Sequence, residues 1–176
     1  LAALIGPGET QIFLQAGEFV APPEVTVTAT MGGVQMVAER HVPQVADERI
    51  RKLADADAAD MLELATLTKP GPFTMRALAL GNFWGIRQNG QLIAMSGERL
   101  KVEGMTEVSG VCTHPDFRGR GLGKLMTLYA AGQVAARGET PFLHTYASNA
   151  AAIGLYEKIG FRLRSHMSVA VVTRQG

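Results

Sequence analysis

A glycine-rich, basic loop lies in the middle of the chain, where Arg118-Gly-Arg-Gly-Leu-Gly-Lys124 follows His114-Pro115. Apolar residues spaced as on one helix face begin at Leu122, so we expect a helix to start within the loop. The first amides of a helix have no intrahelical partner, and the positive end of the helix dipole lies there. Glycines let an anion approach the backbone, and the arginines and lysine add positive charge. The loop therefore predicts a phosphate-binding site.

Spacing excludes two other phosphate-binding loops. A Walker A loop, G-x-x-x-x-G-K-[ST], would need glycine at Arg118 and Ser or Thr at Leu125. The dinucleotide-binding pattern G-x-G-x-x-G would place its third glycine one residue after Gly123, and it belongs to the first βα turn of a domain. The remaining alternative is a passive basic turn between a strand and a helix. Three glycines interleaved with three cations favour the phosphate site.

The segment Arg-x-x-Gly-x-Gly at residues 118–123 resembles the Arg/Gln-x-x-Gly-x-Gly/Ala acetyl-CoA signature of the GNAT superfamily of N-acetyltransferases. Downstream, Asn149-Ala-Ala-Ala-Ile-Gly-Leu-Tyr-Glu-Lys-Ile-Gly-Phe161 is also similar to that family. Glu107-Val-Ser-Gly-Val-Cys-Thr-His114 and His144-Thr-Tyr-Ala-Ser-Asn149 together resemble its glycine-N-acyltransferase-like branch. The resemblance covers roughly residues 48–173.

The resemblance implies that acetyl-CoA is the cosubstrate and indicates where it would bind. Amides of the loop would hold the pyrophosphate, the strand at residues 111–113 would pair its backbone with the pantetheine arm, and Asn149 would lie beside that arm. The cofactor-binding residues expected on this basis are Val111, Cys112, Thr113, Arg118, Gly119, Arg120, Gly121, Leu122, Gly123, Lys124 and Asn149.

A catalytic base would help the acceptor, because a thioester is attacked by a neutral amine, whereas a lysine-like amine has a pKa of about 10.4. Glu107 is the expected base, since it leads into the cofactor strand and the family often has an acidic residue there. Glu98 and Glu103 are weaker alternatives. The competing interpretation of Glu107 is a glutamate that faces solvent, as most do.

Tyr156 matches the tyrosine that often protonates the departing thiolate in this family, and it is the expected catalytic acid. A tyrosine packed only for its area is the alternative. Cys112 is disfavoured as a covalent nucleophile, because a cysteine within a strand is usually a small buried residue. His114 and His144 lack the tight spacing of a ligand set, so we expect no metal.

Hydrophobic patterning predicts the elements that position these residues. Residues 1–45 carry two β-rich segments and form a β-containing N-terminal extension; residues 46–176 form the GNAT acetyltransferase domain. The order in that domain is β-α-α-β-β-β-α-β-α-β, and Asn89-Gly90 predicts a two-residue hairpin. The second helix ends near Ala79. Order and resemblance together predict an α/β (α+β) fold with a mixed, mostly antiparallel central sheet and helices on both faces. The expected strands are 25–30, 34–37, 50–53, 82–87, 91–96, 106–113 and 141–146, and residues 161–172 supply a closing strand or hairpin.

Composition sets limits on the class of protein. The 176 residues suit one domain, and 47% hydrophobic with 19% charged residues excludes a disordered chain. A net charge of +1 gives no general attraction for nucleic acid or anionic membranes. With a single cysteine and no apolar run of about eighteen residues, we expect a cytoplasmic protein without a membrane partner. Because the chain begins with Leu1, we expect a piece of a longer protein.

The expected function is acetyl-CoA-dependent N-acetyl transfer to a primary amine of a small molecule or peptide, by direct attack. A non-catalytic acyl-CoA-binding or sensor module on the same fold is one alternative. A protein-interaction domain that uses the N-terminal extension is another. Homodimerisation through an exposed sheet edge is a further expectation.

Overall fold

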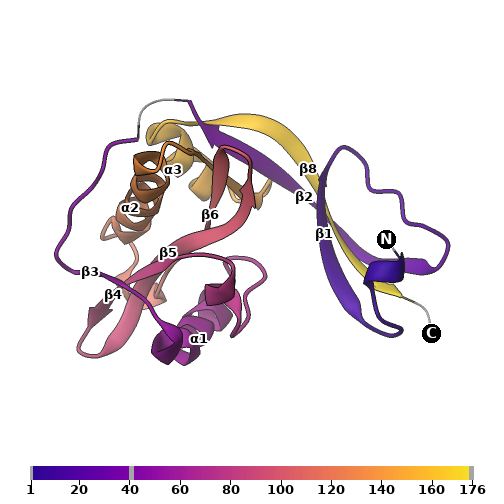
Figure 1. Ribbon diagram of the computed structural model, residues 1–176, viewed down its shortest axis with the longest axis horizontal. Coiled ribbons are helices and arrows are strands. Elements are labelled where there is room, and N and C mark those ends of the chain that lie inside the picture. The colour runs from indigo at the N-terminus through magenta and orange to yellow at the C-terminus, as the bar shows by residue number, and fades with distance from the viewer. Residues whose placement is uncertain (1, 40–41, 175–176) are drawn as a thin grey trace. The chain divides into compact units, whose positions relative to one another are not determined.

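The computed structural model describes residues 2–39 and 42–174 (Figure 1). Its strands are β1 (Thr10–Ala16), β2 (Val25–Ala38), β3 (Ile50–Lys52), β4 (Phe83–Gln88), β5 (Gln91–Val102), β6 (Met105–Thr113), β7 (Thr140–Tyr146) and β8 (Phe161–Arg174). Its α-helices are α1 (Ala58–Thr68), α2 (Leu122–Ala136) and α3 (Ala150–Lys158). Short 3-10 turns include η3 (Ala77–Ala79) and η4 (Pro115–Phe117).

The described chain divides into two compact units. The larger unit contains described residues of 37–143 and 158–161, and the smaller contains those of 1–36, 144–157 and 162–176. β1 and most of β2 therefore share a unit with α3 and most of β8. The expected boundary between an extension of residues 1–45 and the remaining domain stays a prediction.

Within the larger unit, hydrogen bonds pair the strands in the order β3-β4-β5-β6-β7. The pairings from β3 to β6 are antiparallel, and β6 pairs with β7 in parallel. Between β4 and β5 the chain turns at Asn89 and Gly90, whose φ angles are 50° and 83°. These left-handed conformations are what a two-residue hairpin requires. The mixed, mostly antiparallel sheet and its hairpin are therefore confirmed.

Helices α1 and α2 cover opposite faces of this sheet (Figure 1). Phe83 of β4 belongs to the same buried cluster as Met61 and Leu64 of α1. The next residue, Trp84, places its ring centroid 5.7 Å from that of Tyr129 on α2. Successive residues of a strand point to opposite faces, so the two neighbouring aromatic residues anchor one helix each.

One helical prediction differs from the structure in extent. α1 ends where Lys69 adopts a left-handed conformation (φ 51°) just before Pro70. The second helix, expected to end near Ala79, is only the 3-10 turn η3.

In the smaller unit the strands pair in the order β1-β8-β2. The β1–β8 pairing is antiparallel, and a small core under it contains Ile5, Val25, Ala170 and Val172. The two predicted segments at 25–30 and 34–37 form one continuous strand, β2. Gly33 lies inside this strand, where a Cβ would come within 3.3 Å of the Val169 side chain.

Candidate functional site

The predicted phosphate loop connects β6 to α2 through η4. Gly119 and Gly121 both adopt left-handed backbone conformations, with φ angles of 76° and 75°. Gly121 is the N-cap of α2 and, having no side chain, provides no cap hydrogen bond. Leu122 is buried at the first position of the helix and fixes its start in the core. The glycines thus give the backbone a conformation that L-residues rarely adopt.

The main-chain amides of this loop form an open row. Arg118 N donates to Pro115 O at 3.2 Å, and Leu125 N donates to Gly121 O at 3.0 Å. Among the described residues, no hydrogen bond is made by the amides between these two, from Gly119 to Lys124. A helix start without a capping side chain is a ready anion-binding site, because its amide donors and dipole both favour negative charge.

Both left-handed glycines of the loop face open space. A Cβ built on Gly119 or on Gly121 would meet no heavy atom within 4 Å. Beneath the start of α2, the Thr113 hydroxyl is buried and has no hydrogen-bond partner among the described residues. The donor set and the open approach both fit a diphosphate.

Strand β6 leads into the loop, and its pairing with β7 ends before the loop begins. Within the larger unit, the parallel register of β6 and β7 ends at Glu107↔Phe142. The residues expected to meet pantetheine, Val111, Cys112 and Thr113, follow that point. A bulge between β5 and β6 and the left-handed Gly110 (φ 62°) further change the course of β6 there.

Cys112 contributes its backbone to this strand, while its side chain belongs to the buried cluster on the α1 side. Burial raises the pKa of the Cys112 thiol to about 11, and a hydrogen bond with Thr68 opposes this only in part. A thiol with such a pKa is almost entirely protonated near neutral pH. This environment is that of a structural cysteine, in agreement with the sequence-based expectation.

Glu107 is buried, with 1% of its side chain exposed, and this differs from the solvent-facing alternative. Its two carboxylate oxygens accept hydrogen bonds from Arg99 Nε at 2.9 Å and Nη2 at 2.7 Å. Leu100 N adds a longer contact of 3.3 Å to Oε2. The sequence alone did not identify Arg99 as a partner. An incoming proton would have to compete with the Arg99 guanidinium for the two carboxylate oxygens. The geometry therefore weighs against Glu107 as a free base.

Glu98, the weaker alternative, is also fully buried. Asn82 Nδ2 donates to Glu98 Oε2 at 3.2 Å, and Arg137 Nη1 lies 2.9 Å from Oε1. Lys101 Nζ is 3.4 Å from Oε2. Glu98 is therefore a buried carboxylate on β5 whose two cationic partners, Arg137 at the end of α2 and Lys101, are themselves exposed to solvent. By contrast, Glu103 is exposed in the turn that follows β5.

Asn149 and Tyr156 belong to the smaller unit. Asn149 Oδ1 accepts a hydrogen bond from Ala152 N at 3.1 Å, so Asn149 caps α3. Tyr156 is buried on α3 with 8% exposed, and burial raises the pKa of its phenol to about 12. The phenol is therefore neutral and remains a hydrogen-bond donor across the physiological pH range.

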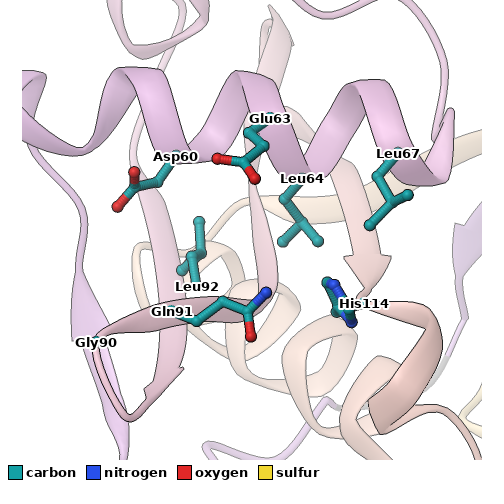
Figure 2. Close-up of a pocket in the computed structure, with 8 residues that line it drawn as sticks. All are labelled: Asp60, Glu63, Leu64, Leu67, Gly90, Gln91, Leu92 and His114. Atoms are coloured by element: carbon teal, nitrogen blue, oxygen red, sulfur yellow. The ribbon is translucent and has the colours of Figure 1, made fainter.

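A separate pocket of about 160 Å³ lies beside α1 in the larger unit. Figure 2 shows α1 side chains above it, the start of β5 below, and His114 at one end. No residue of the loop at 118–124 lines the pocket, and no sequence motif pointed to it. Its lining residues are Asp60, Glu63, Leu64, Leu67, Gly90, Gln91, Leu92 and His114.

Neither a metal centre nor a membrane span is found in the part of the chain that the structure describes. There, no three or more His, Cys, Asp or Glu side chains gather in a way that would hold a metal ion. None of the helices in the same residues combines the length and the apolar character needed to cross a lipid bilayer.

Comparisons with known proteins agree with this geometry. The family model described as FR47-like protein matches residues 83–170. A crystal structure of a GNAT-family protein from Novosphingobium aromaticivorans superposes with a TM-score of 0.93 and 38% identity, covering 99% of this chain and 79% of that one. The ribosomal-protein-S18-alanine N-acetyltransferase structure from Escherichia coli superposes with a TM-score of 0.59 at 22% identity, covering 71% of this chain and 92% of that one. This last likeness concerns the fold alone.

Sequence relatives agree with the superfamily but not with the branch expected from the sequence. [Ribosomal protein bS18]-alanine N-acetyltransferase of Escherichia coli K12 is 34% identical over 77 residues, which is 43% of this chain and 51% of that protein. The chain thus spans about half the length of the curated relatives it matches. None of these matches supports the glycine-N-acyltransferase-like branch.

Proposed function

The chain belongs to the FR47-like family and to the GNAT superfamily, and from this premise we propose that it transfers an acetyl group from acetyl-CoA to a primary amine by direct attack. The observation that carries the proposal is the row of open amides from Gly119 to Lys124 at the start of α2. Bound acetyl-CoA would supply an activated acyl carbon, which a neutral amine attacks with release of the thiol.

In this proposal the amides of the loop hold the pyrophosphate, and the loop cations Arg118, Arg120 and Lys124 add charge. The backbone of residues 111–113 pairs with the pantetheine arm, because β6 has left the register of β7 before this point. On the family resemblance, Asn149, which caps α3, is proposed as a further cofactor-binding residue.

We propose an α-amino group of a peptide or protein as the acceptor to be tested first. The α-amine has a pKa of about 7.7–8.0, so roughly a third of it is neutral at pH 7.5, against about one in a thousand of a lysine amine. Such an acceptor depends less on a strong base, which suits a site where Glu107 is already paired with Arg99. The curated relatives, named as alanine N-acetyltransferases, give the same indication.

Tyr156 is proposed as the donor to the departing thiolate. Its raised pKa makes the phenol a weaker acid but keeps it protonated, so the phenol can donate a hydrogen bond across the physiological pH range. Glu107 is proposed to act through its pair with Arg99, by fixing the bulged region of β6 and β5, rather than by taking the amine proton itself.

Release of free thiol from acetyl-CoA tests the proposal. The acceptor panel contains a peptide with an N-terminal alanine, the same peptide with a blocked N-terminus and one free lysine, and small-molecule amines. We expect release with the α-amine peptide and its loss in the double variant Arg118→Ala, Gly121→Asp. Thermal stabilisation by CoA without thiol release from any acceptor would contradict the enzyme and favour a binding module. The absence of any CoA binding would contradict both.

A further inference from the structure

The three cations of the loop are not equally constrained. Arg118 and Lys124 are exposed, and their side chains make no hydrogen bond or ion pair with any described residue. Arg120 is exposed too but is held at two points. Its Nη2 donates to Asp116 O at 3.3 Å, and its Cζ lies 4.8 Å from the centroid of the Phe117 ring.

The residue under Arg120 is itself fixed. The ring of Phe117 meets the His114 imidazole edge-on, with centroids 5.7 Å apart and an interplanar angle of 75°. His114 Nδ1 accepts a hydrogen bond from Asp116 N at 3.3 Å and thereby caps η4. Only 16% of the His114 side chain is exposed. The His114 ring, which is mostly covered, therefore supports Phe117, and Phe117 supports the guanidinium.

We propose that Phe117 and His114 are positioning residues that hold Arg120 ready for the pyrophosphate, so that Arg120 contributes more to CoA binding than Arg118 does. A free arginine loses rotamer freedom when it binds an anion, whereas a guanidinium already stacked on a ring loses less. One N–H group of Arg120 is used by Asp116 O, and the other donors of its planar fork remain for phosphate oxygens. This inference rests on the proposed function.

The signature at residues 118–123 gave no indication of this ranking, because its defining cation is Arg118, while Arg120 occupies an unspecified position. The signal in the sequence is the aromatic residue at 117 three residues before a basic one. At that spacing, a turn of 3-10 helix followed by the glycine loop brings the two side chains together.

Calorimetric titration with CoA and with 3′-dephospho-CoA tests the inference. We expect Arg120→Gln to weaken both ligands by about tenfold, and Arg118→Gln and Lys124→Gln to weaken them by only about threefold. Phe117→Leu should weaken CoA binding about fivefold in the wild-type background and have no further effect in the Arg120→Gln background. His114→Ala should follow the same pattern. In steady-state kinetics, Phe117→Leu should raise the KM for acetyl-CoA with little change in kcat.

Two results would overturn the inference while the proposed function stands. One is that Arg120→Gln binds CoA as tightly as wild type, which would mean that Phe117 and Asp116 hold Arg120 away from the ligand. The other is that Phe117→Leu weakens binding equally with and without Arg120, which would indicate a general structural role. A loss confined to CoA and absent with 3′-dephospho-CoA would overturn the assignment to the pyrophosphate. Failure of the wild-type protein to bind CoA would overturn the proposed function and this inference together.

Discussion

Alanine at Gly121 separates the conformational role of this glycine from its role in binding. Gly121 lies at the start of α2 with φ 75°, and Gly138 lies just beyond its end with φ 80°. A Cβ at either position meets no heavy atom within 4 Å, so neither substitution creates a clash. Both variants therefore incur only the backbone cost of a left-handed alanine, about 1 kcal/mol. For a chain of this length, that cost lowers the unfolding midpoint by about 2–4 °C.

The two variants should differ in CoA binding although they match in stability. Alanine at Gly121 places a methyl group beside the open amides. If the backbone relaxes to a more favourable φ angle instead, the amide groups of Leu122 and Gly123 rotate away from their binding orientation. We expect Gly121→Ala to weaken CoA binding at least tenfold, roughly the contribution of one charge-assisted hydrogen bond. Gly138→Ala should bind CoA like wild type. Calorimetric titration alongside thermal unfolding measures both quantities. Equal CoA affinities for the two variants would refute the assignment of the loop.

Three further predictions follow from buried groups. Glu107→Gln should lower the free energy of unfolding by roughly 2 kcal/mol, because it weakens the pair with Arg99, whose side chain is partly exposed and so partly solvated. A pH–rate profile that keeps its acidic limb in this variant would confirm that Glu107 is not the catalytic base. Loss of that limb would show that Glu107 is the base. Tyr156→Phe should lower kcat at least tenfold with near-normal CoA binding, and unchanged turnover would remove Tyr156 as proton donor. Folding raises the pKa of Tyr156 from about 10 to about 12, so the free energy of unfolding of the wild type should fall as pH rises through that interval. The Tyr156→Phe variant should show a smaller fall, which unfolding measured as a function of pH would detect. Cys112 should resist iodoacetamide at pH 8 in the folded protein and react in denaturant, as mass spectrometry would show; rapid alkylation of the native state would contradict its burial.

Local chemistry in the sequence was sufficient to predict the loop and the hairpin. Positive φ angles at Asn89, Gly90, Gly119 and Gly121 are requirements of the backbone itself, so residue type and spacing reveal them directly. The cap of α3 by Asn149 was predictable for the same reason. These features involve neighbours in the sequence and need no knowledge of the tertiary structure.

Features that depend on distant neighbours were not predictable from one sequence. Glu107 and Arg99 lie on adjacent strands, and their pairing depends on a bulged register that no single segment specifies. The sequence separated β2 into two segments, 25–30 and 34–37, whereas the strand is continuous and Gly33 packs closely against Val169. The pocket beside α1 likewise forms from three separate segments.

The central claim is that the amides from Gly119 to Lys124 bind the pyrophosphate of CoA. Titration of ¹⁵N-labelled protein with CoA, followed by amide chemical shifts, tests it residue by residue. The account predicts that the largest shifts occur at Gly119 to Lys124, because each of these amides gains a charged acceptor. Unmoved amides in that loop, with the largest shifts instead at Glu63, Gln91 and His114 around the pocket of Figure 2, would contradict it.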